Sequence, residues 1–193
     1  MAAERPLSPV VHHDLTVTLD PASHRLKVHD RIRIPGALVT APLTIALNAD
    51  LDVRAVSGGL RLVPMTSRVQ GSDSGLDRGD SAPRVRVNVY GVESAMPGQE
   101  LTGELDYEGV INYVIRDSGA EYARSFSQSP GLIEDKGIYL AGSTHWVPQV
   151  GDALITYTLA VELPTGWKSV SEGERISSGA LAHVSLLRAG CDG

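Results

Sequence analysis

The chain has 193 residues, of which 42% are hydrophobic and 21% charged, values of an ordinary globular protein rather than a disordered one. Its formal net charge of -6 argues against a nucleic-acid or anionic-membrane surface as its main function. No apolar run approaches the ~20 residues of a transmembrane helix. The single cysteine, Cys191, excludes an internal disulfide and a thiolate-built zinc site.

The first residues of the chain carry no targeting signal that the sequence reveals. Residues 1–6 lack the cationic and then apolar stretches of a signal peptide, so a cytoplasmic location is the default expectation. Export of a longer parent protein stays open. Residues 1–9 are expected to form a flexible segment before the first strand.

The first structured segment reads as a hairpin with one apolar and one solvated face. Apolar residues alternate with polar ones over residues 15–19 and again over residues 26–34, with a turn at residues 20–23 between them. Asp30 breaks this pattern because it falls on the apolar side. A lone buried carboxylate is costly, so the pattern favours a bulge or an edge position at Asp30, with a functional acid as the second interpretation.

Further alternation predicts strands in most of the remaining chain. It recurs over residues 43–47, 51–56, 85–89, 101–107 and 155–163. No segment shows a helical stripe over three turns. The sequence therefore predicts an all-β fold of two packed, mostly antiparallel sheets, a sandwich or saddle with little helix.

Three segments stand apart from this alternation. Residues 66–83 are polar and rich in turn formers, and are expected to form an exposed loop. Residues 108–153 are irregular but contain aromatic side chains, so we expect them to be ordered, with Tyr139 and Trp146 packed on the sheets. Residues 177–193 form a C-terminal segment whose order the sequence leaves open, which places the β domain at residues 10–176.

Motifs for catalysis in this chain alone are absent from the sequence. None of the six histidines forms His-Glu-x-x-His, so ordinary surface histidines are favoured over a metal site. Ser143 follows a glycine, but the Gly-x-Ser-x-Gly elbow of serine hydrolases is missing. No glycine-rich phosphate loop occurs. Arg31, Arg33, Arg84 and Arg86 are interpreted as solvated strand faces rather than as a basic binding stripe.

Several segments together resemble a known family. They are residues 13–21 (HDLTVTLDP), 46–53 (ALNADLDV), 101–109 (LTGELDYEG) and 137–167, which run from GIYL through WVP to TYTLAVELPTGW. In order and spacing they resemble the amino-terminal β-saddle domain of aminopeptidase N-like zinc metallopeptidases. The resemblance covers roughly residues 10–176. The aromatic-proline stretch that usually follows in this family has no match in residues 177–193.

The resemblance implies a noncatalytic domain beside a thermolysin-like catalytic domain. That catalytic domain supplies the His-Glu-x-x-His zinc helix and the Gly-x-Met-Glu-Asn loop, and neither motif is in this sequence. The implied partners are the catalytic domain and a peptide substrate, the implied cofactor is a zinc ion held by the parent, and this chain alone is not expected to be an enzyme. The family also uses a Glu or Gln to hold the substrate's α-amine. Glu134 matches best and Asp135 less well, and a solvated loop acid is the alternative.

Two other functions remain open from the sequence. A free-standing β-sandwich that binds protein or carbohydrate would show a groove, typically lined by aromatic side chains, whereas Trp146 and Trp167 are the only tryptophans. A hydrolase in its own right ranks third. A domain of a larger peptidase would instead present an apolar face to its partner domain.

Overall fold

The computed structural model describes residues 9–71, 84–93, 96–114, 129–171, 174–178 and 181–189. These residues form strands and two short 3-10 helices, Gly36–Leu38 (η1) and Gly142–Thr144 (η2), with no α-helix among them. The predicted all-β fold of two mostly antiparallel sheets is therefore confirmed. No described helix is long and apolar enough to cross a membrane. Residues 1–8, predicted to be flexible, lie outside the described residues.

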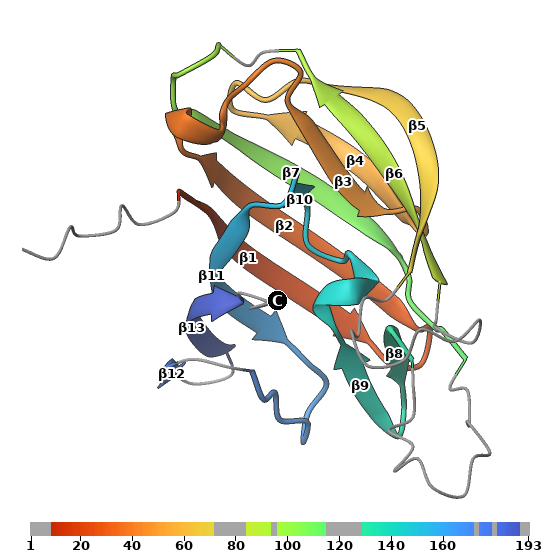
Figure 1. The fold of residues 1–193 in the computed structure, drawn as a ribbon. Coiled ribbons are helices and arrows are strands. Elements are labelled where there is room, and N and C mark those ends of the chain that lie inside the picture. Colours follow the sequence, from red (N-terminus) through yellow and green to blue (C-terminus); the bar gives the residue numbers. More distant parts are fainter. Residues whose placement is uncertain are drawn as a thin grey trace, which may run out of the picture.

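The larger sheet has seven strands and crosses the whole molecule (Figure 1). Its order is β12 (Glu174–Ser178), β13 (Leu181–Ala189), β11 (Leu154–Glu162), β1 (Val10–Asp20), β2 (Arg25–Ile34), β7 (Leu101–Val110) and β4 (Leu51–Ser57). Only β1 and β11 pair in parallel, and the other neighbours are antiparallel. Strands β12 and β13 thus extend the sheet into the segment whose order the sequence left open.

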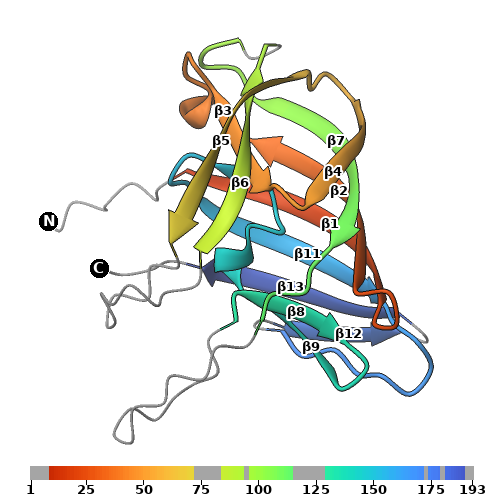
Figure 2. The same ribbon diagram turned by 90° about the vertical axis from the view of Figure 1, so that its right-hand side faces the viewer.

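The smaller sheet has four strands in the order β10 (Gln149–Val150), β3 (Thr44–Asn48), β6 (Arg84–Val92) and β5 (Leu62–Gly71). Figure 2 shows it lying over the β2, β7 and β4 end of the larger sheet. A separate hairpin consists of β8 (Gly131–Glu134) and β9 (Gly137–Leu140). In both views this hairpin lies at the opposite end of the molecule from η1.

The core fills the space between the two sheets because the period-two pattern turns one face of each strand inward. In the β1–β2 hairpin, Val17 faces Val28 and Leu19 faces Leu26 across the strands, and all four side chains are buried. Strand β3 ends at Asn48 and β4 begins at Leu51, yet the two strands belong to different sheets. The short turn between them therefore joins the two layers.

A glycine is required where β7 passes this turn. A Cβ atom added at Gly109 would overlap the carbonyl oxygen of Asp50. The close approach brings the end of β7 against the start of β4, where Leu51 pairs with Gly109. This contact fixes the place at which the chain leaves the sheet for the segment that follows Val110.

The loop predicted at residues 66–83 begins later than the sequence suggested. Residues 66–71 continue β5, and residues 72–83 lie outside the described residues. Strand β5 escaped prediction because it is an edge strand that contains Pro64 and has an irregular register between Pro64 and Thr66. Edge strands tolerate proline and need no strict alternation, since one side faces solvent.

Candidate functional site

The two residues singled out from the sequence lie at the tip of the β8–β9 hairpin. Glu134 ends β8 opposite Gly137, and Asp135 forms the turn with Lys136. Glu134 is half-buried, whereas Asp135 is exposed. Neither carboxylate has a hydrogen bond or ion pair with another described residue. Such a carboxylate is free to accept charge-assisted hydrogen bonds from a ligand ammonium group.

A partly buried polar network anchors the segment that leads to this hairpin. The Asn48 side-chain Nδ2 donates to Tyr113 Oη at 2.9 Å and to the Thr144 carbonyl oxygen at 2.6 Å. The Tyr113 hydroxyl in turn donates to Asp50 Oδ2 at 2.8 Å. Burial is the main cause that raises the pKa of Tyr113 to about 12, and the Asp50 carboxylate contributes in the same direction. The phenol therefore stays protonated at neutral pH and remains a donor.

Backbone hydrogen bonds extend this anchor to the hairpin itself. Tyr113 N donates to the Gly131 carbonyl oxygen at 3.0 Å, and Ile133 N donates to that of Ile111 at the same distance. His24, in the β1–β2 turn, bonds through Nδ1 to the Ile133 carbonyl oxygen. The position of Glu134 is thus tied to the larger sheet by the residue next to it.

Tyr139 and Trp146, the two aromatic side chains predicted to pack on the sheets, differ in their burial. Trp146 is partly buried and packs against the core, which agrees with the prediction. Tyr139 is 56% exposed, so its predicted packing on the sheets is wrong. Tyr139 lies on short strand β9 opposite Leu132 and points away from the core.

We expect Trp146→Ala to lower the free energy of unfolding by about 2–3 kcal/mol, less than the ~3–5 kcal/mol of a fully buried aromatic residue. The matched control is Tyr139→Ala in the same segment, with an expected change below ~0.5 kcal/mol. Urea denaturation followed by circular dichroism measures both values. Equal midpoints for the Trp146 variant and the parent would show that this side chain does not support the fold.

Two histidines are buried, which corrects the expectation of ordinary surface histidines. His145 follows η2 in a left-handed conformation with φ 53°, and its Nδ1 has no hydrogen-bond partner among the described residues. Burial, with a smaller effect of the Arg68 charge, lowers the pKa of His145. His13 is 0% exposed on the inner face of β1. His145 lies in an irregular segment without a period-two pattern to mark it as buried, whereas His13 is in phase with Val11 and Leu15, so extending the alternation of β1 toward its start would have placed it on the apolar face.

Asp30 is the partner of His13, and the predicted bulge or edge position at Asp30 is wrong. Strand β2 lies between β1 and β7, and its register runs without a break through the pairs of Asp30 with Leu15 and Leu105. His13 Nδ1 donates to Asp30 Oδ2 at 2.8 Å, and both side chains are 0% exposed. The partner histidine, seventeen positions away, offsets the cost of burying the carboxylate.

Tyr107 completes this buried cluster on the neighbouring strand. Burial is the main cause that raises the pKa of Tyr107 well above its usual value, and the Asp30 charge adds to it. The Tyr107 hydroxyl and His13 Nε2 have no hydrogen-bond partner among the described residues. The cluster is enclosed by the core, so it contacts no substrate-sized ligand.

The arginines of the strand faces behave as the sequence predicted. Arg31, Arg33, Arg84 and Arg86 are all exposed. The Arg31 Nε lies 2.8 Å from Glu104 Oε1 on the neighbouring strand, and this hydrogen bond is the main cause that lowers the pKa of Glu104. Cross-strand pairing of this kind is typical of a solvated sheet face rather than of a basic surface that binds a ligand.

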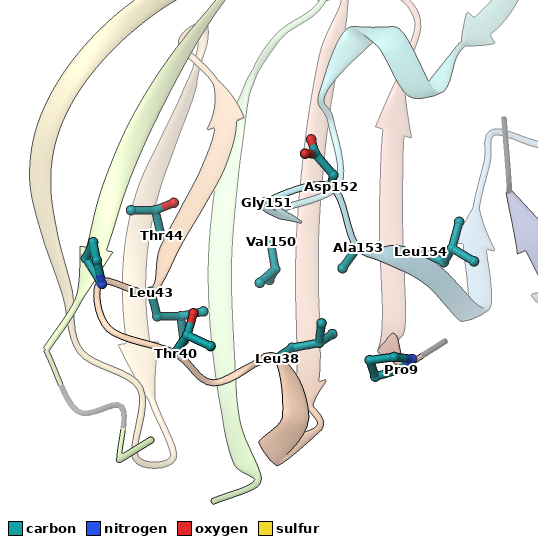
Figure 3. A pocket seen from close by; sticks show the side chains of 11 residues that line it. Pro9, Leu38, Thr40, Leu43, Thr44, Val150, Gly151, Asp152, Ala153 and Leu154 are labelled. Atoms are coloured by element: carbon teal, nitrogen blue, oxygen red, sulfur yellow. The ribbon is translucent and has the colours of Figure 1, made fainter. Parts of the chain in front are cut away.

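The structure also forms an open pocket of about 440 Å³ (Figure 3). Its lining comes from Pro9, from residues 38–44 around η1 and β3, and from residues 150–154 between β10 and β11. These segments meet only through the sheet topology, so no local motif in the sequence points to the pocket. A second hollow, lined by Arg25, Arg54 and Glu108 among others, is a surface crease in which these charges already pair with one another.

No donor set for a metal ion occurs in the part of the chain that the structure describes. There, no three or more His, Cys, Asp or Glu side chains are grouped so that they could hold an ion. Structural and catalytic zinc sites need at least three such protein ligands. The described residues of this chain therefore do not fit a zinc ion.

Comparisons with solved structures identify the fold. The chain is similar to an M1 zinc metallopeptidase variant from Deinococcus radiodurans bound to a Tyr-Ser-Ala substrate, with a TM-score of 0.52 and 15% identity. It is also similar to native yeast LTA4 hydrolase, with a TM-score of 0.52 and 12% identity. No protein-family model and no curated protein matches the sequence.

The likeness spans nearly all of this chain but a minor part of the others. It covers 93% of this chain and 39% of the bacterial peptidase, and 96% of this chain and 29% of the yeast hydrolase. The chain therefore has the fold of one part of these longer metallopeptidase chains. The resemblance drawn from the sequence is confirmed at the level of the fold.

Proposed function

We propose that this chain is the noncatalytic β domain of a zinc aminopeptidase-like metallopeptidase, packed against a catalytic domain whose substrate entrance it shapes. The observation that carries the proposal is the likeness over 93% of this chain to 39% of an M1 zinc metallopeptidase. That structure holds a tripeptide substrate, so peptides are the substrate class we assign to the parent protein.

The zinc ion of this proposal belongs to the catalytic domain of the parent. The described residues of this chain lack a set of ligands for it. In the parent, zinc would supply an activated water or a polarised carbonyl for hydrolysis. The role of this chain would be to position the peptide. That role requires hydrogen-bonding groups on a rigid hairpin and no metal ion.

Within this proposal, Glu134 holds the α-ammonium group of the substrate, with Asp135 as the second choice. Glu134 is favoured because it is half-buried at the end of a strand that is hydrogen-bonded to its neighbours, whereas Asp135 is exposed in a turn. A group fixed in this way loses less conformational freedom when a ligand binds. Among the described residues, no cation pairs with the Glu134 carboxylate, so the substrate ammonium group would not have to displace one.

The alternative of a carbohydrate-binding sandwich has less support. An aromatic platform needs exposed rings, and Trp146 packs against the core instead. Tyr139 is exposed, but among the described residues it is the only aromatic side chain that is a large exposed hydrophobic group. A single ring offers little area for stacking a sugar.

We expect the isolated chain to bind no stoichiometric zinc and to hydrolyse no aminoacyl-anilide substrate, because its sequence contains no His-Glu-x-x-His motif. Elemental analysis of the purified 193-residue chain and a colorimetric assay with and without a chelator test this. One zinc per chain together with turnover that the chelator abolishes would assign catalysis to this chain and overturn the proposal.

A further inference from the structure

The open pocket of about 440 Å³ has an apolar floor that the core holds in place. Leu43 and Val150 are 6% and 4% exposed and belong to the core cluster. Leu38 and Ala153 are partly buried and pack against the same cluster. Because these side chains are fixed by packing, the floor exists before any ligand arrives, which reduces the entropic cost of binding.

The rim of the pocket carries three side chains with unengaged oxygen atoms. Asp152 lies in the turn before β11, Thr44 begins β3, and Thr40 precedes it. None of these three side chains has a hydrogen bond or ion pair with another described residue. Figure 3 shows Thr40 and Thr44 on one side of the pocket and Asp152 on the other, with Val150 between them.

The charge of the lining has one sign. Asp152 is its only charged side chain, since no Lys, Arg or His lines the pocket. The Asp152 carboxylate would repel a bound anion, and no cation in the lining would offset this repulsion. The same carboxylate would attract a bound cation. An ammonium group has N–H donors that the Asp152 carboxylate can accept, while Thr40 and Thr44 offer hydroxyl groups on the other side of the rim.

We propose that this pocket binds small organic ammonium ions, with an aryl or alkyl group on the apolar floor and the ammonium group at the rim beside Asp152. The volume lies within the ~300–1,000 Å³ of small-molecule sites, and an apolar lining with a few polar groups is their usual composition. The proposal uses residues distant in sequence from Glu134 and does not depend on the function proposed above.

The test is a titration of the ¹⁵N-labelled 193-residue chain with 2-phenylethylammonium, followed by nuclear magnetic resonance. We expect saturable shifts at the backbone amides of Val150, Asp152 and Ala153, with a dissociation constant near ~1 mM. The neutral analogue 2-phenylethanol should bind about two- to fivefold more weakly, the range for one exposed ion pair. High salt should reduce this difference.

Two variants and a matched control separate charge from shape. Asp152→Asn should weaken binding of the ammonium probe about two- to fivefold and leave the alcohol unaffected. Thr40→Val should leave the difference in affinity between the two probes unchanged, since Thr40 lies across the pocket from Asp152 (Figure 3). Asp52→Asn removes another exposed carboxylate, which lies outside this pocket, so neither probe should respond.

Three results would each overturn the proposal. Shifts that do not saturate by about 20 mM, or that map elsewhere, would show that the pocket takes no such ligand. Equal affinity for the ammonium probe and the alcohol in the parent chain would show an apolar site without preference for a cation. A chain that sediments as a dimer and becomes a monomer when the probe is added would identify a second copy as the occupant.

Discussion

Replacing Asp30 with alanine should lower the free energy of unfolding by about 2–5 kcal/mol, the cost of leaving its buried hydrogen-bond partner unpaired together with that of the cavity left by the lost side chain. Asp30 and His13 are both 0% exposed, and the carboxylate accepts a 2.8 Å hydrogen bond from His13 Nδ1. Without Asp30, this N–H would be left in the core with no acceptor. Against a total stability of ~5–15 kcal/mol, this is the largest single-residue effect on stability that we expect.

The opposite face of the same sheet carries a matched control, which joins β2 to β7. His29 and Asp106 form the same type of contact at 2.7 Å, but their side chains are 41% and 50% exposed. Asp106→Ala should therefore cost less than ~1 kcal/mol. Asp30→Asn provides a second, milder test if the alanine variant does not fold. Urea denaturation measures all three, and a loss below ~1 kcal/mol for both Asp30 variants would contradict the account of a costly buried pair.

Replacing Glu134 with alanine in the full-length parent should lower kcat/KM for substrates with a free amino terminus by roughly 30-fold to several-thousand-fold. The estimate rests on ~2–5 kcal/mol for removing the partner of a desolvated charge, at tenfold per ~1.4 kcal/mol. Steady-state kinetics on a peptide with a free α-amine measures it. In the isolated chain the same change should leave stability within ~0.5 kcal/mol, since the carboxylate has no hydrogen bond or ion pair with a described residue.

The neighbouring turn supplies the comparison for this kinetic test. Asp135→Asn alters an exposed carboxylate one position away and should change kcat/KM less than about threefold, which is under ~1 kcal/mol. Glu134→Gln keeps the shape and removes the charge, so it should fall between the parent and the alanine variant. If Glu134→Ala stays within threefold of the parent, Glu134 is a solvated hairpin acid and Asp135 becomes the residue to test.

The sequence predicts the fold best where a strand has one buried and one solvated face. Strands β1, β2 and β7 belong to this class, because the larger sheet has its inner face on the core and carries exposed charges on the outer face. Alternation with period two follows directly from that geometry. The order of the strands does not follow from it, and the parallel pairing of β1 with β11 joins segments more than one hundred residues apart.

Predictions failed where a distant partner decides the environment of a residue. Asp30 looks like an interruption of an apolar face until His13 is placed beside it. His145 has no nearby apolar pattern to mark it as buried. The pocket lining, from Pro9 to Leu154, assembles residues of three separate segments. In each case the missing information is tertiary, and single-sequence patterns report only local periodicity.

The central claim is that this chain serves as one noncatalytic domain of a larger zinc metallopeptidase. The most direct measurement isolates the native protein with an antibody against this chain and determines its polypeptide mass and zinc content together. The account predicts a polypeptide well above the 20.5 kDa of this chain, with one zinc ion per polypeptide and hydrolysis of peptides with a free amino terminus. A native product of 20.5 kDa, or a larger one without zinc, would contradict it.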